Sequence, residues 1–327
     1  MLKRIPLLNR LVGGSSGGPG RVNVLRLHGV ISPAKSSGPL GGSGPVLSLE
    51  ALAGDIEKAF KPSGLSAVAL LINSPGGSPV QSNLIAARIR QLADEKNVPV
   101  IAFTEDVAAS GGYWLACAAD EIVADPASIV GSIGVISGGF GFTGLMEKLG
   151  VDRRIYTAGE NKSRLDPFSA EKESDVAWIK SLQLDLHEIF RRFVEQRRGD
   201  KFKVDEPRSL MNGDVFLGEK ALELGMVDGL GDMRSTLRAR FGEKVQIKLV
   251  NKPKRGLSFL NLLGSRGDDP INAAMTALEQ RALWGQYGLQ ASAGPAEGCR
   301  AGGGVPLDRC CFPGAQGARV WVNIDIT

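Results

Sequence analysis

Residues 66–78 are SAVALLINSPGGS, and residues 98–119 are VPVIAFTEDVAASGGYWLACAA. Each stretch opens with a nearly continuous apolar run, which is typical of a strand buried on both faces of a parallel sheet. Each then passes into a turn of small residues. Segments with apolar residues at helical spacing, 48–60 and 79–96, precede and separate them, so the pattern predicts an α/β protein. In such a sheet, ligands bind beyond the carboxyl ends of the strands, where these two turns lie.

The composition limits the kinds of partner and metal site that the chain can have. The chain has 327 residues, 43% of them hydrophobic, and its 39 basic and 35 acidic side chains leave a net charge of only +4. A globular core is therefore expected, and nucleic acid is not expected as a partner. Histidine occurs twice, at His28 and His187. A multi-histidine zinc or iron site cannot be assembled from two, and we expect no metal and no other cofactor.

The two ends of the chain differ from its middle. Residues 1–21 predict a flexible basic tail, residues 22–289 the folded domain, and residues 290–327 a disordered, low-complexity tail. No run of 18 apolar residues occurs, so no transmembrane segment is expected. The basic N-terminus favours peripheral contact with a membrane surface. The predicted location is accordingly cytoplasmic or peripheral at the inner membrane face.

Beyond residue 119, shorter elements are expected. Ser169 is predicted to cap a long helix that ends near Arg198. A polar loop, residues 159–169, comes before this cap. The other predicted elements are strands at 121–125, 133–137 and 153–158 and helices near 142–149, 218–225 and 232–240, followed by a strand at 245–250.

Ser110 is the candidate nucleophile. It follows Ala108 and Ala109 and precedes Gly111 and Gly112, which would place it at the start of a helix. Backbone N–H groups and the helix dipole there favour a developing negative charge. The alternative is that Ser110 merely caps the helix and that both glycine pairs are ordinary tight turns.

A nucleophilic serine needs a base. Both histidines have structural interpretations, since His28 follows a strand and His187 lies within a helix. A neutral lysine can deprotonate a serine instead, and Lys162 lies in the polar segment GENKSRLDPF, residues 159–168. The alternative for Lys162 is a solvated surface charge.

Four segments carry a family resemblance: INSPGGS (72–78), AASGGYWLACAADEIVADPASIVGSIGVI (108–136), YTAGENKSRLDPF (156–168) and GEKALELGMVDGLGD (218–232). In this order they resemble the signal peptide peptidase A (protease IV) family of Ser-Lys peptidases, within the ClpP/crotonase superfamily. The resemblance runs from about residue 22 to residue 289. It implies an α/β fold of repeated ββα layers, in one catalytic domain with a long C-terminal helical part.

The resemblance also implies roles for individual residues. Ser110 matches the family nucleophile and Lys162 the general base. Ser132, in GSIG, matches a serine that orients the lysine. Gly77 and Gly111 match the positions whose backbone N–H groups form the oxyanion hole.

The implied function is that of a serine-type endopeptidase. Its expected substrates are leftover signal peptides or other short or unfolded polypeptides. Single-domain relatives complete their sites by assembling rings, so a homo-oligomer is expected. Two alternatives stay open: an acyl-CoA enzyme of the crotonase type, which shares the oxyanion hole without the nucleophile, and an inactive scaffold with the same fold.

Overall fold

The computed structural model describes residues 19–33 and 46–251. All of them lie in the first of the two units into which the chain divides, Met1–Ala293. The predicted tail at 290–327, and all but the last three residues of the tail at 1–21, lie outside the described residues.

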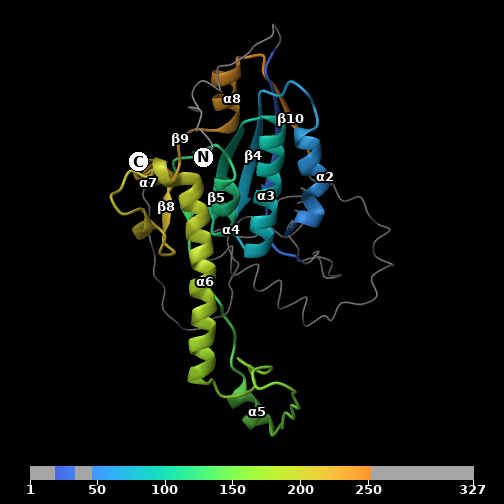
Figure 1. Ribbon diagram of the computed structural model, residues 1–327, viewed down its shortest axis with the longest axis vertical. Coiled ribbons are helices and arrows are strands. Elements are labelled where there is room, and N and C mark those ends of the chain that lie inside the picture. The colour runs from blue at the N-terminus through green and yellow to red at the C-terminus, as the bar shows by residue number, and fades with distance from the viewer. Residues whose placement is uncertain (1–18, 34–45, 252–327) are drawn as a thin grey trace, which may run out of the picture. The chain divides into compact units, whose positions relative to one another are not determined.

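The described residues form one main sheet, ordered β10-β1-β4-β5-β6-β9, in which every neighbouring pair is parallel (Figure 1). β7 pairs in parallel with the end of β5, and β8 pairs with β7 in antiparallel. This confirms the predicted α/β class. The strands are β1 (Arg21–His28), β4 (Ala67–Ser74), β5 (Val100–Ala109), β6 (Glu121–Ala124), β7 (Ile129–Gly131), β8 (Val215–Leu217), β9 (Gly229–Leu230) and β10 (Gln246–Leu249).

Helices cover both faces of this sheet. On one face, buried side chains of α2 (Leu49–Phe60), α3 (Pro79–Lys96) and α4 (Gly111–Cys117) share a core with Leu25, Leu70 and other strand residues. On the other face, α8 (Met233–Phe241) buries Leu237 against Val24, Ala69 and Phe103. The main core therefore lies between the sheet and the α2–α4 layer, and the α8 layer covers a smaller one.

Local signals explain where several helices begin. Ser48 caps α2 by accepting the N–H of Ala51, as its position before the apolar repeat predicts. Ser78 caps α3, and Pro79 occupies the first helical position. The remaining helices are α5 (Thr143–Leu149), α6 (Glu173–Arg198) and α7 (Gly218–Leu224), and the short strands β2 (Val30–Ile31) and β3 (Val46–Leu47) pair in parallel.

Three local predictions are wrong. The strand expected at 133–137 is replaced by β7 just before it, because Gly131 (φ 108°) and Ser132 (φ 52°) turn the backbone into the left-handed region. Residues 153–158 form no strand; Ile155 and Tyr156 are exposed there. Ser169 does not cap α6, because its hydroxyl donates to Asp166 instead and the helix begins at Glu173.

α6 joins the sheet region to an exposed part of the chain. Phe190 and Val194 are buried in the main core, and Phe190 stacks on Trp114 of α4. The first turns of α6 lead away from the sheet to α5 (Figure 1). We call residues 136–184 the arm. Among the described residues, no helix combines the length and apolar character required to cross a bilayer.

A buried polar cluster anchors the C-terminal end of α6. Arg198, 2% exposed, donates to the carboxylate of Asp228 at 2.7 Å and to the carbonyl of Gly225 at 2.8 Å. Burial raises the pKa of Asp228, but the hydrogen bond and the charge of Arg198 lower it by more. The pKa of Asp228 is therefore below its usual value. Nearby, burial raises the pKa of the Cys117 thiol to about 12. The ion pair thus holds the C-terminal end of α6 against Asp228, the residue that precedes β9.

Candidate active site

Ser110 lies between β5 and α4 in a strained conformation. Its φ of 51° and ψ of −120° are unusual for a residue with a Cβ, and a serine at a sharp strand-to-helix turn is typical of an exposed nucleophile. Two backbone hydrogen bonds hold it there. Its N–H donates to the carbonyl of Gly131 at 2.8 Å, and its carbonyl accepts the N–H of Trp114 at 3.0 Å.

The Ser110 hydroxyl does not cap α4. It makes no capping hydrogen bond, although Ser110 occupies the N-cap position and is only half-buried. The interpretation of Ser110 as a helix cap is therefore wrong. A strained backbone whose side-chain hydroxyl makes no hydrogen bond with a described residue is a reason to look for function.

The turn after β4 presses against Ser110. A Cβ at Gly76 (φ 104°) would lie 2.8 Å from Ser110 Cβ and 2.8 Å from Gly111 N, so only glycine permits this approach. Gly77 (φ 136°) is bridged to Ile31, with Ile31 N–H donating to Gly76 O at 2.8 Å and Ser78 N–H donating to Ile31 O at 2.7 Å. In such a parallel pairing the intervening N–H of Gly77 points away from Ile31.

Gly111 follows Ser110 as the first residue of α4. Its N–H is one of the four at a helix start that have no intrahelical acceptor. Its packing is tight, because a Cβ there would overlap the hydroxyl of Ser82. Ser82 is fully buried and donates to the carbonyl of Ser78 at 2.9 Å. The two glycine turns therefore pack directly on each other, and Ser82 packs against Gly111.

Ser132 lies beside Ser110 in the same chain. The parallel pairing of β5 and β7 matches Ala109 with Gly131, so Ser110 and Ser132 are the next residues on adjacent strands. Ser132 has φ 52°, and its N–H donates to the carbonyl of Asp214 at 2.7 Å. The structure thus brings together four of the five predicted site residues: Ser110, Ser132, Gly77 and Gly111.

Lys162 is not brought together with them. It belongs to the arm, where its side chain is exposed and forms no hydrogen bond or ion pair with a described residue. Arg164 and Leu165, just beyond it, are held at Asp175 in the first turn of α6. Twelve residues of helix, about 18 Å, separate Asp175 from His187.

Neither histidine is placed to serve as base. His187 Nε2 lies 2.9 Å from the carbonyl oxygen of Ile133 and 2.8 Å from that of Met211. Two carbonyl acceptors require a proton on that nitrogen, which leaves it no lone pair. His28 pairs with Glu105 on the α8 face of the sheet. Within the described chain, no three or more His, Cys, Asp or Glu side chains are placed to hold a metal ion.

Two residues that shape the candidate site were not identified from the sequence. Gly76, rather than Gly77, makes the close contact with Ser110, and Ser82 fills the space beneath Gly111. Gly76 could have been identified from the sequence, since it belongs to the same SPGG motif as Gly77. Ser82 carried no signal, because a serine one turn into a helix has no special pattern.

A family model and several known proteins match the sequence of this chain. The model of peptidase family S49 matches residues 92–247. A Synechocystis sp. protein named "Putative protease" is 30% identical over 236 residues, covering 70% of this chain and 83% of that protein. The chloroplastic serine protease SPPA of Arabidopsis thaliana is 30% identical over 270 residues, covering 80% of this chain and 39% of that protein.

Other relatives extend well beyond the matched region. A Brucella abortus protein named Na(+)/H(+) antiporter NhaA is 49% identical over 279 residues, which are 82% of this chain but 37% of that protein. The chain thus spans well under half the length of the Brucella and Arabidopsis relatives. A solved structure, a mutant of the 1510-N membrane-bound stomatin-specific protease, aligns with a TM-score of 0.39 and 16% identity, covering 72% of this chain and 100% of that one.

Proposed function

Because the chain belongs to peptidase family S49, we propose that it is a serine-type endopeptidase with Ser110 as nucleophile. The observation that carries the proposal is the state of Ser110, whose left-handed backbone is held by Gly131 and Trp114 while its hydroxyl stays uncommitted. A strained turn of this kind costs of order 1–3 kcal/mol and persists at functional sites. A purely structural serine at this position would be expected to cap α4.

The oxyanion hole is assigned to the backbone N–H groups of Gly77 and Gly111. Gly111 follows Ser110 directly, Gly77 follows Gly76, which packs against Ser110, and both belong to turns that only glycine fits. In comparable enzymes, removing one such donor costs about 2.7–4 kcal/mol of transition-state stabilisation. The packing of Gly76 against Ser110 supports this assignment, because it keeps the first turn within reach of the nucleophile.

The base is assigned to Lys162 of the partner subunit in a homo-oligomer. Within one chain, Lys162 is on the arm and does not contact Ser110. The arm also exposes apolar side chains that a neighbouring copy would cover: Ile136, Phe140, Leu145, Leu149, Val151 and Tyr156. Tyr156 is the most exposed of them, at 91%, and a group of exposed apolar side chains marks an interaction surface. Ser132, adjacent to Ser110, would receive and orient the incoming amine.

The reaction then proceeds by two acyl transfers. The neutral amine of Lys162 accepts the Ser110 proton as Oγ attacks the peptide carbonyl, and the two amides bind the oxyanion. The lysine returns that proton to the leaving amine as the C–N bond breaks. Water, deprotonated by the same amine, hydrolyses the acyl-enzyme and restores Ser110. Leftover signal peptides and unfolded polypeptides are the proposed substrates, while the predicted cellular location stays a prediction.

Mixing two inactive variants tests both parts of the proposal. Ser110→Ala and Lys162→Ala are each expected to lose cleavage of a fluorogenic peptide. If neighbouring copies share a site, subunits mixed at equal amounts and reassembled recover about a quarter of wild-type activity, since half the serines are intact and half of those face an intact lysine. Persistent inactivity of the mixture, with each variant folded, would contradict a site shared between subunits.

A fluorophosphonate probe tests the nucleophile separately. Labelling is expected on wild type and lost in Ser110→Ala, with Ser137→Ala as a control on an exposed serine outside the site. If the folded protein is not labelled and instead binds acyl-CoA, the crotonase alternative is correct. If it does neither and cleaves no peptide, the chain is a scaffold.

A further inference from the structure

A second pocket lies on the α8 face of the sheet, away from Ser110. Alternate residues at the ends of β1, β4 and β5 point to this face, because side chains alternate along a strand. Those nearer the strand starts are covered by α8. The last pairs on this face are Arg26 and His28, Leu71 and Asn73, and Phe103 and Glu105, in cross-strand register for β1 and β4; all of them line the pocket, and Phe103 also packs in the α8 core.

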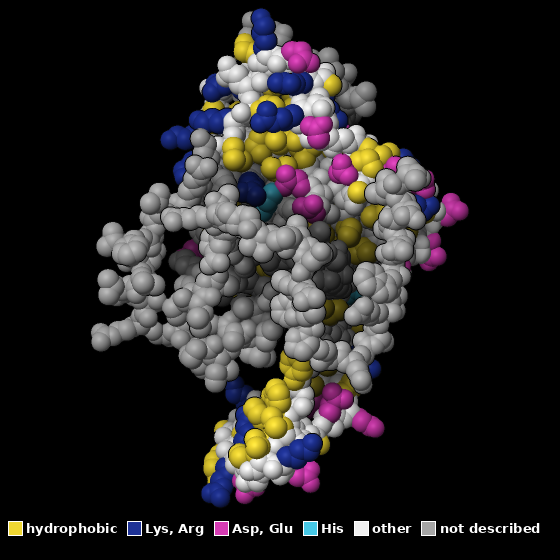
Figure 2. All heavy atoms as spheres, turned by 180° about the vertical axis from the view of Figure 1, so that it is seen from behind, with side chains coloured by type: hydrophobic (Ala, Val, Ile, Leu, Met, Phe, Trp, Pro, Cys, Tyr) yellow, Lys and Arg dark blue, Asp and Glu magenta, His cyan; other side chains and the backbone are white. Residues whose placement is uncertain are grey.

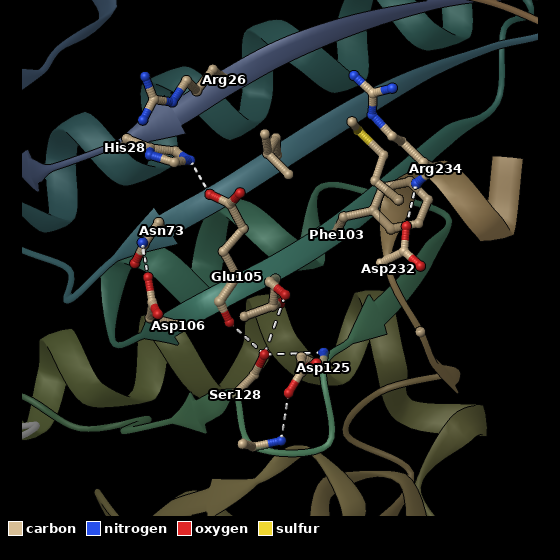
Figure 3. A pocket seen from close by; sticks show the side chains of 15 residues that line it. Arg26, His28, Asn73, Phe103, Glu105, Asp106, Asp125, Ser128, Asp232 and Arg234 are labelled. Atoms are coloured by element: carbon tan, nitrogen blue, oxygen red, sulfur yellow. Dashed lines mark hydrogen bonds and ion pairs between the residues drawn. The ribbon is translucent and has the colours of Figure 1, made fainter.

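These residues line a pocket of about 690 Å³ between the strand ends and the start of α8. Its floor is apolar, formed by Leu71, Phe103 and Met233. In Figure 2 a hollow lies between the apolar side chains at the top of the molecule and acidic ones beside it, with a histidine and a basic side chain in its wall. Figure 3 shows that Asn73 and Arg234 lie on opposite sides of the pocket.

One end of the pocket is rich in hydrogen-bond acceptors. Glu105 lies 2.5 Å from His28, and the hydrogen bond from His28 holds the pKa of its carboxyl below the usual value. The Asn73 amide donates to Asp106, which leaves Asn73 Oδ1 buried without a partner in the described chain. A buried acceptor without a donor is costly. Arg26 lies beside His28 at this end (Figure 3), and its charge also lowers the pKa of Glu105. Asn73 Oδ1 and the carboxylates of Glu105 and Asp106 nevertheless make this end suited to a ligand group that brings several N–H donors.

The other end offers a free cation. The guanidinium of Arg234, in the first turn of α8, forms no hydrogen bond or ion pair with a described residue. Its neighbour Asp232 forms no ion pair with it and instead caps α8, accepting the N–H groups of Arg234 and Ser235. A guanidinium in this state is suited to a carboxylate, which it binds in bidentate fashion.

We propose that this pocket binds a short apolar peptide with both ends free. Its α-ammonium group is bound by Asn73 Oδ1 and the carboxylates of Glu105 and Asp106. Its apolar side chains lie on Leu71 and Phe103. Its α-carboxylate pairs with Arg234. Such peptides are chemically what an endopeptidase releases, but binding here involves no residue of the Ser110 site and does not depend on catalysis.

Trileucine tests the proposal, with isothermal titration calorimetry on the full-length Ser110→Ala protein so that cleavage does not interfere. Saturable binding at one site per chain is expected, weakened about tenfold by N-acetylation and about tenfold by C-amidation of the peptide, since each removes one charge-assisted contact. Equal binding of free and blocked peptides, or no saturable binding at millimolar concentration, would overturn the proposal.

Protein variants then locate the contacts. In Arg234→Gln, amidation of the peptide should no longer weaken binding, and in Asp106→Asn the effect of acetylation should shrink. Arg238→Gln, the same change one turn along α8 and outside the pocket, is the matched control. All three side chains belong to exposed residues, and circular dichroism checks the fold. If Arg234→Gln leaves the effect of amidation intact, the peptide binds elsewhere and the inference fails.

Discussion

Replacing Ser110 by glycine should give a more stable protein than replacing it by alanine, and both changes should abolish activity. At φ 51° a residue with a Cβ carries a steric cost of about 1–2 kcal/mol, which glycine avoids. Glycine in turn makes the unfolded chain more flexible, which lowers stability by about 0.4–1 kcal/mol. The balance predicts that Ser110→Gly has a free energy of unfolding about 0.5–1 kcal/mol above that of Ser110→Ala.

The comparison with alanine isolates the backbone effect, because both variants lack the hydroxyl. Denaturant unfolding measures the difference, and the melting temperature should differ by roughly 2 °C in the same direction. Ser181, exposed within α6, provides the control. There the order should reverse, with glycine less stable than alanine by about 1 kcal/mol.

The result that refutes the reasoning is a Ser110→Gly protein no more stable than Ser110→Ala, while the Ser181 pair behaves as expected. The backbone at Ser110 would then store no strain. Its left-handed conformation could no longer be interpreted as a cost that function maintains.

Three further predictions follow from the packing. Gly77→Ala should abolish peptidase activity and lower the melting temperature, measured by calorimetry, because its Cβ would overlap Ile31 O; an active, stable variant would contradict the glycine argument. Asp228→Asn should lower the free energy of unfolding by about 3–5 kcal/mol by leaving Arg198 buried and unpaired. The pKa of Asp228 is lowered in the folded protein, so the difference in free energy of unfolding between wild type and Asp228→Asn should be fully present at pH values above the pKa of this carboxyl in the unfolded chain. The difference should shrink as the pH falls through the pKa of Asp228 in the folded protein. A difference in denaturant titrations that does not change with pH would refute this prediction. Cys117, with a pKa of about 12, should resist iodoacetamide at pH 8 until the protein is unfolded, tested with the three C-terminal cysteines changed to serine; labelling of the folded protein would contradict its burial.

The regular α/β part was predictable because its signals are local. Continuous apolar runs found β4 and β5, and Ser48 marked the start of α2. The arm was not predictable in the same way. Residues 153–158 have the composition of a strand, yet no neighbouring strand pairs with them in the described chain, and an apolar segment forms a strand only where a partner exists.

The candidate site likewise contains residues that local sequence signals indicate and residues that they do not. Ser110 became a candidate from its position at a strand end, which follows from the fold class, whereas Gly77 and Gly111 received their roles from the resemblance. Ser132 follows from the pairing of β7 with β5, which lies outside the reach of local patterns. Lys162 was selected through the resemblance, and in the described chain it lies exposed on the arm, away from Ser110.

The order of the sheet has a consequence for synthesis. β1, at the beginning of the described chain, is flanked by β4 and by β10, and Asn251 bonds both backbone groups of Arg26 just beyond that pairing. A chain still emerging from the ribosome, or one cut before Gln246, therefore presents β1 as an open edge with the apolar residues Val22, Val24 and Leu25. Unpaired edges of this kind recruit other strands. β10, the last strand of the described residues, therefore closes an edge of β1 that would otherwise favour aggregation.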